Sequence, residues 1–128
     1  MNYKEIESII AGKDKIFISS HMNPDGDSLG SAYAMYHYLK KLGKDCRIIN
    51  HSPTPEVYNF LNTDNIFYEL DGDNVGFIKN ADLGIILDIG DFYRLGDIAY
   101  LIEDNNIETL SIDHHPQSDN ELFTNAFI

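Results

Sequence analysis

The chain has 128 residues, enough for one domain with a buried core, and a formal net charge of −12. Its 9 Lys and Arg are scattered, which excludes a stand-alone binder of duplex DNA, although bound divalent ions would still let a small phosphate ester bind. A single cysteine, Cys46, excludes an internal disulfide and predicts a cytoplasmic protein with this residue in its core, and no apolar run is long enough to span a membrane.

The first half of the chain alternates predicted helices with predicted strands. The expected elements are a helix over residues 3–11, a strand over 15–20, a helix over 28–42, a strand over 44–50 and a short helix over 54–61. In the long helix, Ser28 is expected as the N-cap and Gly43 as the residue that ends it. Tyr33, Tyr36 and Leu39 recur at helical spacing, which predicts a core-facing stripe.

The second half continues this alternation. The expected elements are a strand over residues 64–70, a turn over 71–74, a strand over 83–87, a helix over 95–105 and a strand over 109–112. The segment over 83–87, LGIIL, is nearly continuously apolar, as in a strand buried on both faces. Strands that alternate with helices predict an α/β fold with a mostly parallel sheet and helices on both faces, and no linker marks a second domain.

Acidic and imidazole side chains follow three of the predicted strands. They are His21, Asp25 and Asp27 after the first strand, Asp88 at the end of residues 83–87, and Asp113, His114 and His115 after residues 109–112. Because the carboxyl ends of parallel strands meet at one edge of a sheet, we expect these groups to form one site. Their side chains suit divalent ions such as manganese and magnesium. His37 and His51 lie away from this edge in the predicted fold and are expected to be ordinary polar residues.

The spacing of the first acids suggests two metal ions. Asp25 and Asp27 lie two residues apart, so each carboxylate can serve one of two neighbouring ions, and Gly26 lets the backbone turn tightly between them. Asp88 can bridge both ions. Such a pair can activate water and stabilise an in-line displacement at phosphorus. The alternative is that Asp25 and Asp27 only cap the following helix, which explains one of them but not His21 or the distant groups.

Three segments carry a family resemblance. HMNPDGDSLGS, LDIGD and SIDHHP resemble the first, second and third motifs of the DHH phosphoesterases, so that residues 15–116 resemble the N-terminal domain of this family. The resemblance implies a Rossmann-like domain that binds two divalent ions, manganese first and magnesium as the alternative. It implies the following ligands: His21, Asp25 and Asp88 for one ion, and Asp27, Asp88 and His114 for the other.

The same resemblance implies roles in catalysis and substrate binding. Asp88, Asp113 and His115 would be the catalytic residues, with His115 on the substrate phosphate and Asp113 orienting the histidines. Arg94, in DFYRLGD, matches a recurrent family arginine and is a candidate phosphate ligand, with an ordinary surface arginine as the alternative.

Gly26 and the SLGS segment that begins at Ser28 look most like the nanoRNase/pAp-phosphatase branch. That branch implies hydrolysis of phosphate esters in short oligonucleotides or 3′,5′-bisphosphate nucleosides. A family II inorganic pyrophosphatase, which typically has Thr in place of Gly26, and a non-catalytic metal- or nucleotide-binding fragment stay open as alternatives, and so does a homo-oligomer.

The resemblance also implies that the family's fourth motif follows residues 123–128, and that the family's C-terminal substrate-binding domain is absent from these 128 residues. We therefore expect residues 1–128 to form a DHH domain that is incomplete at its C-terminus, truncated before the fourth motif. On that reading the chain alone is a weak or inactive catalyst, because a metal ligand and the positioning energy of the substrate domain are missing.

Overall fold

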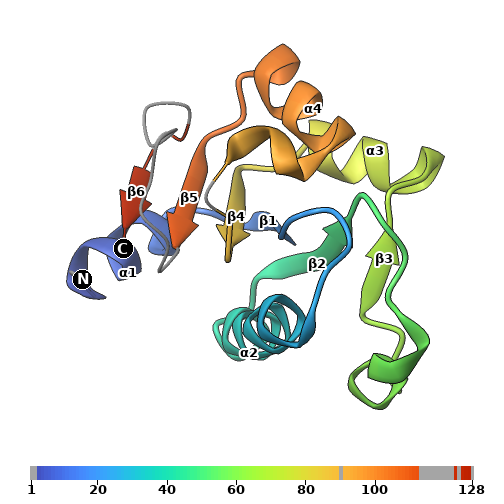
Figure 1. Cartoon of the computed structure of the whole chain (residues 1–128). Coiled ribbons are helices and arrows are strands. Elements are labelled where there is room, and N and C mark those ends of the chain that lie inside the picture. Colours follow the sequence, from blue (N-terminus) through green and yellow to red (C-terminus); the bar gives the residue numbers. More distant parts are fainter. Residues whose placement is uncertain (1–2, 90, 113–122, 124, 128) are drawn as a thin grey trace.

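The computed structural model describes residues 3–89, 91–112, 123 and 125–127. Its strands are β1 (Lys15–Ser19), β2 (Asp45–Asn50), β3 (Phe67–Glu69), β4 (Leu83–Leu87), β5 (Thr109–Ile112) and β6 (Asn125–Phe127). Its helices are α1 (Tyr3–Ala11), α2 (Gly26–Lys41), α3 (Gly72–Lys79) and α4 (Asp97–Asn105), with the 3₁₀ segments η1 (Glu56–Leu61) and η2 (Phe92–Leu95). The strands form one parallel sheet in the order β3-β2-β1-β4-β5-β6, which confirms the expected α/β fold (Figure 1).

Helices cover both faces of this sheet, and each layer has its own apolar core (Figure 1). Ile16, Ile18 and Ile85 lie with α1 and α2, whereas Phe17 and Ile86 lie with α3 and α4. Successive strand residues therefore point to opposite buried faces, which explains why β4 is apolar throughout. None of the described helices is both long and apolar enough to cross a membrane.

The strand order contains one reversal, between β1 and β4. The chain runs outward from β1 through β2 to β3, and then returns to place β4 on the other side of β1. In an open parallel sheet, such a reversal leaves a crevice at the carboxyl ends of the two central strands, where ligands bind. The residues that follow β1 and β4 therefore lie where this fold is expected to bind a ligand.

Two helix starts differ from the expectation. The segment over 71–74 is the beginning of α3 rather than a free turn: Asp71 is the N-cap, and its side chain accepts a hydrogen bond from Asn74 N–H at 2.9 Å. Asp-Gly-Asp-Asn suits a turn and a helix start equally well, because both use a side-chain oxygen to accept backbone N–H groups. The N-cap of α2 is Asp25, and Ser28 is its partner three residues on.

Two expectations about the core have different outcomes. Cys46 is buried, as expected. The predicted stripe on α2 is only partly right, because Leu39 is buried and Tyr36 half-buried, whereas Tyr33 is exposed. The face of α2 that carries these apolar residues is wider than the core can cover. The Tyr33 ring packs instead against exposed His37 on the surface of the helix.

The close packing of β1 on β4 gives a first prediction. Gly84 pairs with Phe17 in the register, and a Cβ atom on Gly84 would lie 2.4 Å from Phe17 Cζ. We expect Gly84→Ala to lower the free energy of unfolding by about 1–3 kcal/mol, because the fully buried ring has to move. Gly76→Ala is the control: it is in α3 with open space around it, and alanine favours helix by roughly 1 kcal/mol. Equal urea midpoints for the two variants would contradict the prediction.

The buried thiol gives a second prediction. Burial raises the pKa of Cys46 from 9.0 to about 11. Because the thiolate is the reactive form, the folded protein should react with a thiol reagent at pH 8 about 100-fold more slowly than the urea-unfolded chain. The rate of colour release from a disulfide reagent measures this, and a folded protein that reacts as fast as the unfolded chain would contradict it.

Candidate metal centre

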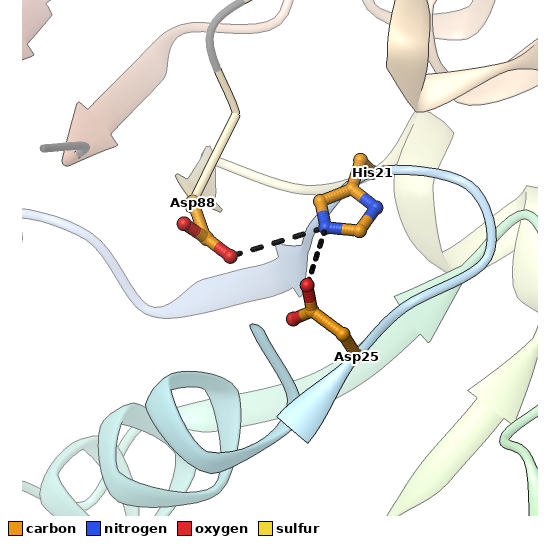
Figure 2. A group of neighbouring side chains, drawn as sticks. All are labelled: His21, Asp25 and Asp88. Carbon is orange, nitrogen blue, oxygen red and sulfur yellow. Dashed lines mark ion pairs between the residues drawn. The ribbon is translucent and has the colours of Figure 1, made fainter. Parts of the chain in front are cut away.

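Three of the predicted ligands converge at the reversal between β1 and β4. His21 follows β1, Asp25 precedes α2 and Asp88 follows β4 (Figure 2). His21 Nε2 lies 3.8 Å from Asp25 Oδ2 and 3.9 Å from Asp88 Oδ2. One ligand atom from each residue lies within 4.8 Å of the other two. The arrangement brings one imidazole nitrogen and two carboxylate oxygens to a single point.

The His21 ring is oriented by the backbone of the next residue. Its Nδ1 lies 2.8 Å from Met22 O, and because a carbonyl oxygen only accepts, Nδ1 carries the hydrogen. In the neutral ring, Nε2 then has a free lone pair, and it is this atom that faces the two carboxylates in Figure 2. The residue is 6% exposed. A hydrogen bond from the second ring nitrogen is the usual way in which proteins fix a metal-binding histidine.

Asp25 uses its two oxygens differently. Oδ1 accepts a hydrogen bond from Ser28 N–H at 3.0 Å, whereas Oδ2 faces His21. Asp25 N–H donates in turn to Ser28 Oγ at 3.0 Å, which completes a capping box at the start of α2. The Ser28 N–H holds the pKa of Asp25 below its ordinary value, with a smaller contribution from His21, against the opposing effect of partial burial. This carboxylate is therefore a helix cap and a candidate ligand at the same time.

Asp88 occupies an unusual backbone conformation. Its φ is +56°, in the left-handed region, which Asp tolerates better than most residues but which still costs free energy. Its N–H donates to Ile112 O at 3.2 Å, so β5 holds the backbone where β4 ends. The residue is 9% exposed. Strained residues of this kind gather at functional sites, where the surrounding structure maintains them.

Neighbouring loops hold the His21 loop in place. Met22 N–H donates to Arg94 O at 2.7 Å, and Asn23 N–H donates to Ser52 Oγ at 3.1 Å. His51 also belongs to this edge because it directly follows β2, so its expected place away from the edge is wrong. Its role is polar, as expected: His51 Nδ1 accepts a hydrogen bond from Asp97 N–H, at the start of α4.

The other predicted site residues have different positions. Asp27 is exposed in the first turn of α2 and is not a member of the group of three. Arg94 is exposed in η2. Asp113, His114 and His115 lie outside the described residues, and β5 ends at Ile112, immediately before them in the sequence. Within the described part of the chain, three of the predicted ligands are thus together.

Gly26 has a different role from the one expected. It is the first residue of α2, and its φ is not in the left-handed region, so no tight turn requires glycine here. A Cβ atom at this position would lie 3.4 Å from both Cε1 and Oη of Tyr58, in η1. A Cβ atom at that distance would make an ordinary van der Waals contact, so what the structure shows at Gly26 is the packing of the Tyr58 ring against the start of α2.

The donor set fits a divalent metal ion. Imidazole nitrogen and carboxylate oxygen together suit borderline and hard ions, and no thiol is present to favour a softer one. The pKa of Asp25 is lowered, so it remains ionised to lower pH than an ordinary aspartate, and His21 Nε2 faces both carboxylates. The three side chains are therefore placed where they could hold one ion.

Comparisons with known proteins agree with the fold and with the family resemblance of the sequence. Residues 15–128 match the DHH family, N-terminal domain. A bifunctional oligoribonuclease and PAP phosphatase NrnA from Mycoplasma genitalium is 31% identical over 107 residues, which are 83% of this chain and 32% of that protein. The protein of the same name from Thermus thermophilus is 35% identical over 60 residues, or 41% of this chain and 18% of that protein.

Among solved structures, an exopolyphosphatase-related protein from Bacteroides fragilis is similar in fold. It has a TM-score of 0.87 and 23% identity, and the similarity covers 97% of this chain and 37% of that one. The chain thus spans about a third of the length of the Mycoplasma relative and of this structure. With the family match over nearly its whole length, the chain belongs to the DHH family of phosphoesterases and carries the N-terminal domain of that family.

Proposed function

We propose that this domain hydrolyses phosphate esters in short oligonucleotides or 3′,5′-bisphosphate nucleosides and uses two divalent metal ions. Manganese is the proposed metal, with magnesium as the alternative. The observation that carries the proposal is the group formed by His21, Asp25 and Asp88 at the carboxyl edge of the sheet, in a domain of the DHH family. The NrnA relatives, which are named for oligoribonuclease and PAP phosphatase activities, support this choice of substrates.

The chain's own side chains would hold the first ion. His21 offers Nε2 because Nδ1–H is engaged by Met22 O, and Asp25 offers Oδ2 because Oδ1 is engaged by Ser28 N–H. Asp88 offers a carboxylate from the end of β4. When bound, divalent ions polarise a phosphoryl oxygen and activate water for in-line attack.

For the second ion we propose Asp27, Asp88 and His114. Asp27 supports this assignment by its place in the first turn of α2, two residues after Asp25. We assign His115 and Arg94 to the substrate phosphate and Asp113 to the orientation of the histidines. Arg94 follows β4 in η2, and its backbone contacts Met22 in the His21 loop, which supports a role beside the metal centre.

The shared ligand provides the most direct test. We expect Asp88→Asn to weaken Mn²⁺ binding about 100-fold or more, because it removes an anionic ligand, and even the loss of a supporting residue typically costs about 10–100-fold. Isothermal titration with MnCl₂ measures the dissociation constant. Asp82→Asn is the matched control, since it removes the same charge just before β4, at the opposite edge of the sheet, where Asp82 accepts hydrogen bonds from Asp14 and Lys15 N–H. An unchanged titration in Asp88→Asn would contradict the metal centre.

A substrate panel tests the chemistry. With Mn²⁺, we expect residues 1–128 to release phosphate from adenosine 3′,5′-bisphosphate and mononucleotides from a dinucleotide only slowly, because the domain is expected to be incomplete, and we expect Asp88→Asn to abolish both activities. Pyrophosphate should be a poorer substrate than either. Faster cleavage of pyrophosphate would favour the pyrophosphatase alternative, and nucleotide binding without turnover would favour a non-catalytic binding module.

A further inference from the structure

A buried amide lies behind the loop that carries His21. Asn50 is the last residue of β2 and is 2% exposed. Its Oδ1 accepts hydrogen bonds from Ser20 N–H at 2.9 Å, from Ser20 Oγ at 3.2 Å and from Ser19 Oγ at 3.4 Å. A buried amide is costly unless it is hydrogen-bonded, so these three donors account for the position of this oxygen.

The Asn50 side chain continues the pairing of β1 with β2 beyond the end of β1. The last register pair is Ile18 with Ile48, and β1 ends at Ser19. Ser20 is fully buried and still has a backbone N–H that needs an acceptor. Asn50 Oδ1 supplies this acceptor in place of a strand carbonyl, and so fixes the Ser19–Ser20 peptide group, one residue before His21.

The peptide group after His21 is fixed as well. Met22 N–H donates to Arg94 O at 2.7 Å, so the backbone is held on both sides of the imidazole. The Nδ1 contact with Met22 O then sets the ring orientation, with Nε2 toward Asp25 and Asp88. Of the two backbone restraints, the one on Ser20 depends on a side chain and can therefore be removed by substitution.

We propose that Asn50 is a positioning residue for the metal centre, whose amide oxygen fixes the backbone at Ser20, directly before His21, so that His21 Nε2 faces the two carboxylates. The inference rests on the proposed function, because it takes His21 as a metal ligand. Groups that orient a metal-binding histidine typically contribute about 10–100-fold to metal affinity. Removal of the Asn50 oxygen should therefore weaken the centre although Asn50 touches no ion.

Three variants of the full chain test this inference, each measured by titration with MnCl₂ and by urea unfolding. Asn50→Leu keeps the approximate size of the side chain but removes the acceptor. Asn50→Asp keeps the acceptor. Asn74→Leu is the matched control, because Asn74 is also buried, at 3% exposure, and its side chain bonds to Glu69 O and to Arg47.

We expect Asn50→Leu to raise the dissociation constant for Mn²⁺ by about 10–100-fold. Asn50→Asp should bind no more than about threefold more weakly than the wild type, and Asn74→Leu should lose stability without losing metal affinity. If Asn50→Leu does not fold, Asn50→Ala replaces it, since the smaller residue leaves room for water beside Ser20. The inference is overturned if the acceptor-free variant binds as well as the wild type, if Asn50→Asp loses as much as that variant, or if Asn74→Leu loses affinity equally. Failure of the wild type itself to bind Mn²⁺ would instead remove the proposed metal centre.

Discussion

The parallel pairing of β1 with β4 is the constraint on which the site depends. The register places Ser19 opposite Ile86, so the chain leaves both strands at neighbouring points, and His21 and Asp88 reach the same position from distant parts of the sequence. If the register of the two strands shifted by one residue, Phe17 would point toward α1 and α2, and a different set of residues would pack against α3 and α4, because side chains alternate between the faces of the sheet. The 3.9 Å contact between His21 and Asp88 is thus maintained by the two apolar cores.

Asp25 joins this centre through the start of α2. Ser28 N–H holds one carboxylate oxygen and thereby directs the other toward His21, so the interaction that begins the helix also orients the candidate ligand. A cap and a ligand are usually treated as competing interpretations of an aspartate that precedes a helix. Here a carboxylate with two oxygens can serve both roles, which explains why the capping interpretation could account for one acid and still leave the metal interpretation intact.

The sequence predicted strands β1 to β5 and helices α1, α2 and α4, because apolar runs and helical spacing report burial directly, as in LGIIL of β4, but it did not predict α3. The sequence also predicted that His21, Asp25 and Asp88 lie at one edge of the sheet, because each of them follows the carboxyl end of a strand, directly or in the loop after it. Local polar patterns were less informative: Asp71 to Asn74 resembled a turn, and Ser28 resembled an N-cap, because the same side-chain bonds serve turns and helix starts. The role of Asn50 required the register of β1 and β2, which no local pattern contains.

The three candidate ligands share a physical property: each is held by an interaction that does not involve a metal ion. Ser28 holds Asp25, Ile112 O holds the strained backbone of Asp88, and Met22 O holds the His21 ring. A cation that binds here would find its ligands in place and would have little conformational entropy to remove. Two carboxylates near one point repel each other, and the hydrogen bond from Ser28 N–H to Asp25 offsets part of this cost before any ion arrives. The positions of the candidate ligands are therefore set by hydrogen bonds of the surrounding structure. For this reason Asn50, which bonds to the residue before His21, can affect the metal affinity of a site that it does not touch.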